Sequence, residues 1–363
     1  MTTGGIAMFN VCISTFCVWN SYGSMLQAYG LQYALAQMGC RGFVASAKQA
    51  PEETWTFPGF RRKNPKAILV DAHQLLISHR IRRRFLAANR FIADHIAIEY
   101  FGTPEALRQS PPEADAYLSG SDQVWNPIKL DPVFFLDFIP EGYPRISYAA
   151  SMGITRVPEE KQPEFQRLVG SFDHISLREQ DMLPVIGTCT DRPAQVHIDP
   201  VFLVPEEHWR QLAKPYPIAE PYILVYPIYW DKKLNRQLKQ LHKKTGKTIV
   251  AVLGQAQQVY ANRRIYDASP EQFLWLVDHA DAVVSSSFHG IAMSLVLGKP
   301  FSAVMDPRSS SRLQCLLQTL GVRNTGICEL AEKRQDGPDA LDSRILAERQ
   351  KSMDYLRKVL SFT

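Results

Sequence analysis

A histidine in a serine-rich turn is the part of this sequence best suited to chemistry. Residues 281–301 predict a buried strand at Ala282–Val284, a polar turn at Ser285–Ser287 and a helix that opens at His289 and Gly290. The free amide groups and the dipole at a helix N-terminus attract anions. An imidazole in that first turn would place a proton donor beside a bound phosphate or carboxylate. The pattern indicates acid catalysis on an anionic substrate, and a buried structural histidine is the alternative.

Arginines elsewhere in the chain are candidates to hold such an anion. Arg178 follows a predicted strand at Ile175–Leu177, and a guanidinium group binds a carboxylate or phosphate through two parallel hydrogen bonds. Arg308 and Arg312 belong to a polar loop after the strand that follows the histidine's helix. The alternative for Arg178 is an ion pair with Glu179. The alternative for the two loop arginines is a solvent-exposed position without a specific role.

Polar turns after predicted strands supply further candidates for substrate binding. These residues are Asn20, Gly23, Ser121, Asp122, Gln123, Ser286 and Ser287. Gly23 alternatively only permits a tight turn, and Asp122 alternatively caps a helix. We expect Trp125 in the core. We expect Asp199, which precedes Pro200, to shape the connection between domains rather than to act as a base.

The composition is typical of a soluble globular protein. The chain has 363 residues, of which 45% are hydrophobic and 21% charged. No apolar run approaches the ~20 residues that cross a bilayer, and the N-terminus lacks the features of a secretory signal. The six cysteines are scattered without zinc-ligand spacing, which favours reduced thiols in the cytoplasm and no metal site. The net charge of +5 points weakly to anionic partners.

Short apolar strands alternate with helical patterns along the chain, which predicts an α/β fold with parallel, doubly wound sheets. Predicted strands include Ile6–Ser14, Ile146–Ala150 and Tyr222–Tyr226, and Ser269 with Gln272 predicts a capped helix start. A cluster of prolines after residue 204 marks a connection between domains. We therefore expect an N-terminal domain at 1–204 and a C-terminal domain at 205–363. Whether the C-terminal helix, around Ser352–Leu360, returns to the first domain stays open. Ligands are expected where the carboxyl ends of the strands face a cleft.

One predicted helix carries a basic face beside an apolar stripe. Its arginines are Arg80, Arg82, Arg83, Arg84 and Arg90, and its stripe is Ile77, Ile81, Phe85, Ala88, Ile92 and Ile96. Such a face suits contact with an anionic membrane surface or a lipid diphosphate. The alternative is an ordinary solvated helix face. Nucleic acid is not expected as a partner, because no supporting motif is present.

Six short motifs extend over nearly the whole chain. They are Asn20–Gln32, Gly120–Asn126, Ser147–Ser151, Ser176–Glu179, Asp199–Leu203 and Ser286–Gly290. Each alone is weak, but their order and spacing together resemble the polysaccharide pyruvyl transferase family.

This resemblance implies a fold and a reaction. The implied fold is two Rossmann-like domains that face a cleft, similar to glycosyltransferases of the B type. The implied reaction moves the pyruvyl group of phosphoenolpyruvate, a co-substrate rather than a cofactor, onto a sugar of a surface polysaccharide or its lipid-linked precursor. The products are a pyruvate ketal and phosphate. His289 matches the family's histidine and would protonate the methylene carbon, while Arg178 would bind the anionic groups.

The chain departs from the family at one position of this site. Better-known members carry Arg-x-His, whereas here Ser287 stands two residues before His289. We expect Arg308 and Arg312 to replace the missing charge, with Lys299 as a weaker third candidate. A different donor or acceptor is the alternative.

Two other functions stay open at this point. One is a glycosyltransferase that uses a nucleotide sugar, because architecture alone does not determine function. The other is a binding protein without catalysis. A cytoplasmic location is expected, and peripheral contact with the inner face of the membrane is left open.

Overall fold

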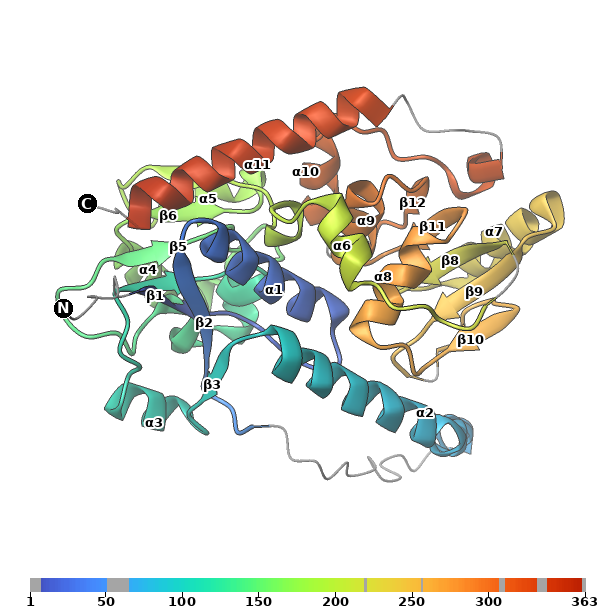
Figure 1. Cartoon of the computed structure of the whole chain (residues 1–363), viewed down its shortest axis with the longest axis horizontal. Coiled ribbons are helices and arrows are strands. Elements are labelled where there is room, and N and C mark those ends of the chain that lie inside the picture. Colours follow the sequence, from blue (N-terminus) through green and yellow to red (C-terminus); the bar gives the residue numbers. More distant parts are fainter. Residues whose placement is uncertain are drawn as a thin grey trace, which may run out of the picture.

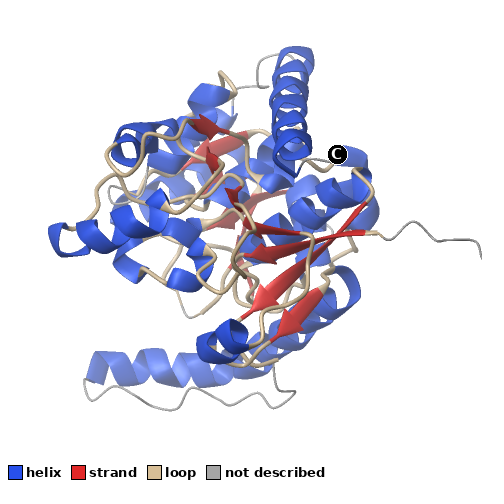
Figure 2. Ribbon diagram, turned by 90° about the vertical axis from the view of Figure 1, so that its left-hand side faces the viewer, coloured by secondary structure: helices blue, strands red, loops and turns tan. Residues whose placement is uncertain are grey.

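The computed structural model describes residues 8–50, 65–218, 221–255, 257–306, 311–331 and 338–360. Within these ranges the chain forms two five-stranded parallel sheets, one from each half of the sequence (Figure 1). Helices pack around both sheets, as Figure 2 shows. Ile6 and Ala7, the start of the predicted first strand, lie outside the described residues.

The N-terminal sheet has the strand order β3-β2-β1-β4-β5. Strands of this half are β1 Phe9–Ser14, β2 Cys40–Ser46, β3 Ile98–Tyr100, β4 Ala116–Ser119, β5 Arg145–Ser147, β6 Ile175–Leu177 and β7 Ala194–Val196. Bridges from Ile146 to His174 and from Ala150 to Leu177 join the β6–β7 pair to this sheet. The β5 strand ends before the predicted Ala150, and Ala149 beyond it has a left-handed backbone with φ of +47°.

The C-terminal sheet has the strand order β10-β9-β8-β11-β12. Its strands are β8 Tyr222–Tyr226, β9 Thr248–Val252, β10 Arg263–Ile265, β11 Ala282–Ser285 and β12 Phe301–Ala303. All residues of β8 and β11 are buried, as expected for central strands of a parallel sheet with helices on both faces. The chain crosses from β9 out to β10 and then back to β11, so β8 and β11 meet at a switch in strand order.

Helices connect nearly all of these strands. They are α1 Tyr22–Gln37, α2 Pro65–His95, α3 Pro104–Gln109, α4 Gln162–Gly170, α5 Leu183–Gly187, α6 Glu206–Leu212, α7 Lys232–Thr245, α8 Pro270–Asp278, α9 Phe288–Val296, α10 Ser311–Thr319 and α11 Pro338–Leu360. The predicted start of α8 is confirmed: Ser269 Oγ accepts from Gln272 N at 3.1 Å, and Gln272 Oε1 accepts from Ser269 N at 3.0 Å. The α7 helix ends at Gly246, with φ of +68°.

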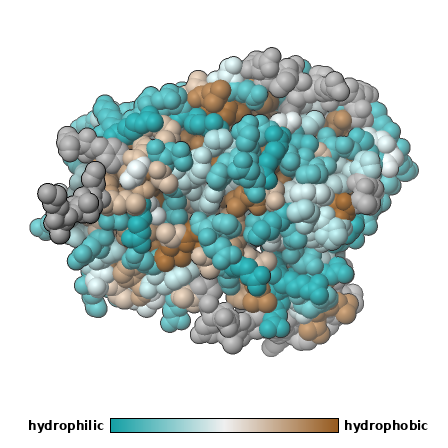
Figure 3. Space-filling view, viewed as in Figure 1, coloured by the Kyte–Doolittle hydropathy of each residue, from teal (hydrophilic) through white to brown (hydrophobic). Residues whose placement is uncertain are grey.

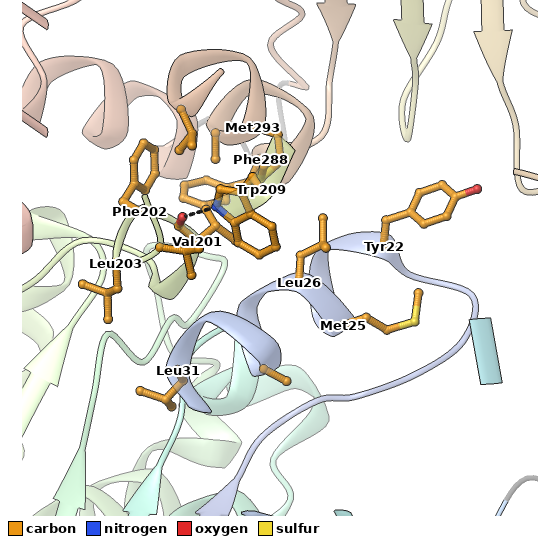
Figure 4. Packing of buried hydrophobic residues seen from close by; sticks show 14 of the residues in the cluster. Tyr22, Met25, Leu26, Leu31, Val201, Phe202, Leu203, Trp209, Phe288 and Met293 are labelled. Atoms are coloured by element: carbon orange, nitrogen blue, oxygen red, sulfur yellow. Dashed lines mark hydrogen bonds between the residues drawn. The ribbon is translucent and has the colours of Figure 1, made fainter. Parts of the chain in front are cut away.

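One hydrophobic core joins the two halves of the molecule. Tyr22 and Leu26 of α1 lie in the same cluster as Phe288 and Met293 of α9, as Figure 4 shows. Trp209 of α6 fills the space between them, and its Nε1 donates to Val201 O at 3.0 Å. Packing of α1 against α9 thus brings the turn after β1 to the turn after β11.

Helix α11 extends from the C-terminal half back over the N-terminal sheet (Figure 1). Ser352 Oγ accepts from Ile198 N at 3.4 Å, and the Tyr355 hydroxyl donates to Ser147 O at 2.9 Å. Arg349 Nε donates to Phe202 O at 2.7 Å. These contacts tie the C-terminus to the first half of the chain. A domain boundary at 204/205 stays a prediction.

Helix α2 also bridges the two halves. Ile77 and Ile81 pack into the core of the C-terminal sheet, whereas Ala88 and Ile92 belong to the core shared with α1. The apolar stripe is confirmed, since all six of its residues are buried. The basic face is confirmed except at Arg84, which is only 2% exposed. Arg84 is buried because it stacks on an aromatic ring of α1.

The face of the molecule shown in Figure 3 is largely hydrophilic, with small scattered hydrophobic patches. None of the helices in the described part of the chain has the length and apolar character needed to span a membrane.

Candidate active site

His289 lies in the first turn of α9, directly after the carboxyl end of β11. Ser287 is the N-cap, and its Oγ accepts from Gly290 N at 3.4 Å. Ser285 Oγ donates to Tyr226 O at 2.6 Å and accepts from Ser287 N at 3.0 Å. Hydroxyl groups therefore build the turn that presents the imidazole.

Ser286 ties this turn to the loop after β8. Its Oγ accepts from Ile228 N at 2.9 Å and from Tyr229 N at 2.8 Å. The hydroxyls of Ser286 and Ser287 are thus both engaged within the protein. Their predicted role in substrate binding would require these bonds to be exchanged.

Asp199 is the partner of His289. His289 Nε2 lies 3.4 Å from Asp199 Oδ2, and Nε2 has no hydrogen bond to any described residue. Asp199 is fully buried, and its Oδ1 accepts from Val201 N at 3.1 Å. Burial by itself would raise the pKa of Asp199, but His289, Arg178 and these hydrogen bonds hold that pKa below its usual value. The result is a buried, ionised carboxylate 3.4 Å from the imidazole.

Gly23 makes room for the imidazole. A Cβ atom at this position would lie 2.1 Å from His289 Nδ1. Gly23 is the second residue of α1 rather than part of a tight turn, and its backbone is not left-handed. The glycine is therefore required by the close approach of α1 and α9.

Arg178 follows β6 and shares the carboxylate of Asp199. Its Nη1 lies 2.6 Å from Asp199 Oδ2, its Nε 3.4 Å from Glu179 Oε1, and its Nη2 4.0 Å from Asp122 Oδ1. The guanidinium stacks on the Phe288 ring at 4.2 Å. Burial would lower the pKa of Arg178, but the three carboxylates outweigh burial and raise it. The buried Nη2 has no hydrogen-bond partner among the described residues.

Glu179 is a buried carboxyl group on the other side of this arginine. Ser151 Oγ lies 2.5 Å from its Oε1, while the buried Oε2 has no hydrogen-bond partner in the described part of the chain. Burial raises the pKa of Glu179, and Arg178 and Ser151 oppose the shift only in part.

Ser121 and Asp122 belong to the turn after β4. Ser121 Oγ lies 2.8 Å from Ala149 O and 3.3 Å from Asp199 Oδ2, so it supports the carboxylate. Asp122 has φ of +70° and caps a 3₁₀ turn, Gln123–Trp125, through a hydrogen bond from Gln123 N at 2.9 Å. The capping alternative for Asp122 is thus observed, and Trp125 is buried as predicted.

Arg312, predicted in a loop, is the second residue of helix α10 and lies beside Gln123. With the amide of Gln123 oriented to present its oxygen, that oxygen accepts from Arg312 Nη1 at 2.9 Å and from Nη2 at 3.0 Å. Burial and the neighbouring Arg178 lower the pKa of Arg312. Its buried Nε has no hydrogen-bond partner among the described residues. Two guanidinium groups, each with one unused N–H site, therefore lie near one another.

The other predicted cations lie elsewhere. Arg308 falls outside the described residues. Lys299 follows the C-terminal end of α9, where its Nζ donates to Asp278 O at 2.5 Å. Lys299 is therefore at the opposite end of the helix from His289. Asn20 is exposed, and its carbonyl accepts from Arg84 Nη2 at 3.3 Å.

A cavity of about 200 Å³ lies beside Arg178 and Arg312. Arg178, Asp199, Phe288 and Arg312 contribute to its wall, as does Lys351 of α11. A larger hollow of about 840 Å³, between residues 155 and 189, contains none of the predicted site residues. The small cavity is the one that borders the His289–Asp199–Arg178 cluster. No group of three or more potential metal ligands occurs in the described ranges.

Sequence reasoning missed two members of this cluster. Asp199 was expected only to shape a connection, and Glu179 was considered only as an ion-pair partner. Both lie in the motifs Asp199–Leu203 and Ser176–Glu179, so the motifs themselves were the available signal.

Two parallel sheets whose carboxyl edges meet at one contact define an α/β fold of two Rossmann-like units. The chain belongs to the polysaccharide pyruvyl transferase family, whose sequence model matches residues 22–305. The resemblance stated from the motifs is thereby confirmed.

Solved structures confirm the predicted fold class. The UDP-GlcNAc 2-epimerase from Neisseria meningitidis bound to UDP-GlcNAc superposes with a TM-score of 0.51 at 13% identity, covering 97% of this chain and 100% of that one. A putative UDP-N-acetylglucosamine 2-epimerase from Listeria monocytogenes gives a TM-score of 0.51 at 10% identity, covering 97% and 91%. At these identities the likeness concerns the fold alone. The curated proteins contain no match.

Proposed function

We propose that this protein transfers the pyruvyl group of phosphoenolpyruvate to two hydroxyls of a sugar, forming a pyruvate ketal and phosphate. The acceptor is a surface polysaccharide unit or its lipid-linked precursor. Family membership supports the reaction class. The single observation that carries the assignment of residues is the contact of His289 with Asp199 and, through the same Oδ2 atom, with Arg178.

His289 supplies the proton in this proposal. The protonated imidazole delivers a proton to the methylene carbon of phosphoenolpyruvate, which becomes a methyl group, and positive charge develops on the neighbouring carbon. One sugar hydroxyl attacks that carbon, and its proton returns the imidazole to the charged form. The second hydroxyl then displaces phosphate, which carries away the remaining proton. Asp199 stabilises the imidazolium before transfer. A positioned acid of this kind typically contributes ~10²–10⁴ in rate.

The two arginines hold the donor in this proposal. Phosphoenolpyruvate carries a carboxylate and a phosphate, and the unused Nη2 of Arg178 and Nε of Arg312 are suited to them. Arg312 would thereby supply the charge that Ser287 lacks.

We place the reaction in the cytoplasm. The six cysteines are all free, which suits a reducing compartment. Exposed Arg80, Arg82 and Arg90 of α2 would suit transient contact with an anionic membrane surface, where a lipid-linked acceptor resides.

The proposed function is tested by product analysis. Purified protein is incubated with phosphoenolpyruvate and candidate sugars, and inorganic phosphate and the ketal methyl group are followed by NMR. Release of phosphate only when sugar is present supports pyruvyl transfer. Release of a nucleoside diphosphate from a nucleotide sugar would instead indicate a glycosyltransferase. Absence of thermal stabilisation by phosphoenolpyruvate would favour a non-catalytic binding protein.

A further inference from the structure

Arg84 is a buried cation that the proposed reaction does not use. Its side chain extends from α2 to the junction of the two halves and is 2% exposed. Nη1 donates to Leu253 O at 3.4 Å, just beyond the end of β9, and Nη2 donates to Asn20 O at 3.3 Å, between β1 and α1. The guanidinium stacks on the Tyr22 ring at 4.1 Å. It therefore lies at the carboxyl ends of strands from both sheets.

The charge of Arg84 has no counterpart. Among the described residues, no carboxylate lies within 4.0 Å of its guanidinium nitrogens, and its buried Nε has no hydrogen-bond partner. Asp267, a carboxylate of the same region, lies 3.9 Å from the exposed Arg83 instead. Arginine is rarely buried without a paired anion, because an unpaired charge in the interior is costly.

The local backbone adds positive potential instead of cancelling it. Tyr22 is the first residue of α1, a helix of 16 residues. The amides of Tyr22 and Gly23 precede the first intrahelical hydrogen bond, and the macrodipole is positive at this end. Ser21 Oγ satisfies only the amide of Ser24, at 3.2 Å. An arginine without a carboxylate partner thus contacts Asn20 and Tyr22, the residues on either side of the N-cap of α1.

We propose that Arg84 and the N-terminus of α1 form a binding site for a phosphate group of a substrate, separate from the Arg178–Arg312 pair. Both carbonyl contacts of Arg84 are long, so a charged oxygen would replace them at little cost. Asn20, whose carbonyl accepts from Arg84, is exposed, so a ligand would reach Arg84 by displacing this loop residue.

The site adjoins the candidate catalytic group. Gly23, next to Tyr22, contacts the imidazole of His289, and Tyr226 lies beside both Tyr22 and Gly290. A phosphate at Arg84 would thus be held close to the reacting centre. Because the proposed function gives both anionic groups of phosphoenolpyruvate to Arg178 and Arg312, this phosphate would belong to a sugar acceptor linked to a lipid through a diphosphate. This assignment of the source rests on the proposed function, whereas the phosphate site itself does not.

Binding of inorganic pyrophosphate tests the site without turnover. Titration calorimetry at constant ionic strength compares the wild type with Arg84→Met and with Arg82→Met, an exposed arginine of the same helix. We expect Arg84→Met to lose one class of pyrophosphate site, with affinity reduced about tenfold or more, and Arg82→Met to match the wild type. Unchanged stoichiometry and affinity in Arg84→Met would overturn the site, whatever the enzyme's activity.

Arg84→Lys is a second variant that keeps the proposal testable if Arg84→Met does not fold. It keeps one charge without the planar guanidinium, so we expect pyrophosphate affinity between those of the wild type and Arg84→Met. A folded Arg84→Lys that binds as the wild type does, together with an Arg84→Met that only lowers the melting temperature, would make Arg84 a structural clamp and contradict the proposal.

Two further probes identify the source of the phosphate. Phosphoenolpyruvate represents the donor, and geranyl diphosphate represents a lipid diphosphate. Weaker binding of phosphoenolpyruvate alone in Arg84→Met assigns the site to the donor, and weaker binding of geranyl diphosphate alone assigns it to the acceptor. Loss of pyrophosphate binding in a protein that never releases phosphate from phosphoenolpyruvate would keep the phosphate site and reject pyruvyl transfer.

Discussion

Arg178 and Arg84 are the same kind of side chain in opposite electrostatic surroundings. Both are buried, at 7% and 2% exposure, and both stack on an aromatic ring, Phe288 of α9 or Tyr22 of α1. Arg178 has three carboxylates within 4.0 Å, whereas the described residues around Arg84 supply carbonyl oxygens and tyrosine side chains but no carboxylate within that distance. Burial alone therefore does not define the role of a buried arginine.

The difference separates two ways of using a cation. The carboxylates around Arg178 keep it charged and hold it in one orientation, so its one free nitrogen is presented to a ligand in a fixed geometry. Arg84 is held by two carbonyl contacts and by the Tyr22 ring, and no carboxylate among the described residues lies within 4.0 Å of its guanidinium nitrogens. The contact between Gly23 and His289 lies between these two environments. Changes at each of them should therefore have distinct consequences.

The largest expected effect concerns the group between them. His289→Gln removes the proton donor but retains a side chain of similar size, so we expect turnover to fall by about 10²–10⁴. Both arginine environments should persist, and protection of the folded protein by phosphoenolpyruvate should be largely kept. Phosphate release and thermal shifts measure the two quantities. Near-normal turnover would remove His289 from the mechanism.

Asp199→Asn should make Arg178 resemble Arg84. The substitution removes the carboxylate closest to the buried Arg178. Such a loss typically lowers the free energy of unfolding by about 3–5 kcal/mol. We expect a large loss of stability in urea, with a smaller loss of turnover than for His289→Gln. The exposed Asp181→Asn is the matched control.

The pH dependence supplies a second test of Asp199. Its pKa in the folded protein is lower than in the unfolded chain, so its contribution to stability is present above a pH of about 4 and disappears as the pH falls below that. Asp199→Asn should therefore lose most of the acid-dependent part of the stability curve. An unchanged acid limb would contradict the assigned ion pairs.

Arg312 extends the Arg178 environment toward the donor. We expect Arg312→Ala to raise the half-saturation for phosphoenolpyruvate about tenfold, since it removes one charged hydrogen bond. Adding Ser287→Arg should restore part of that loss, so the two changes would not be additive. Strict additivity in the four half-saturation constants would show that Ser287 and Arg312 do not serve the same anion.

Regular elements were the most predictable part of this molecule. The β8 strand, Tyr222–Tyr226, was predicted with its observed bounds, and the capping box of α8 was read directly from Ser269 and Gln272. These features depend on neighbours in sequence, so a local pattern suffices. The turn before His289 was equally predictable, because a buried strand, three serines and a helix follow in order.

Contacts between distant segments were not predictable in this way. Arg84 follows the same helical pattern as Arg83, and only the packing of α2 against Tyr22 buries one and exposes the other. Likewise, Gly23 looked like a turn residue, but the imidazole of His289, over 260 residues later, explains it. Asp199 acquires its role only when β6 and α9 bring Arg178 and His289 to it. Such features require tertiary structure.

The smallest expected effect is that of Glu179→Gln. This substitution removes a carboxyl group whose ionised form is disfavoured by burial. The folded-state pKa of Glu179 is raised, so its contribution to stability is present at low pH and is lost as the pH rises through that value. The glutamine oxygen can still accept from Ser151, and Arg178 keeps its closest partner, Asp199. We therefore expect Glu179→Gln to be slightly more stable than the wild type at pH 8 and nearly equal to it at pH 5. Urea unfolding at the two pH values measures this difference. A marked loss of stability at pH 8 would mean that the ionised form of Glu179 is needed beside Arg178, and that Arg178 depends on all of its carboxylates rather than mainly on Asp199.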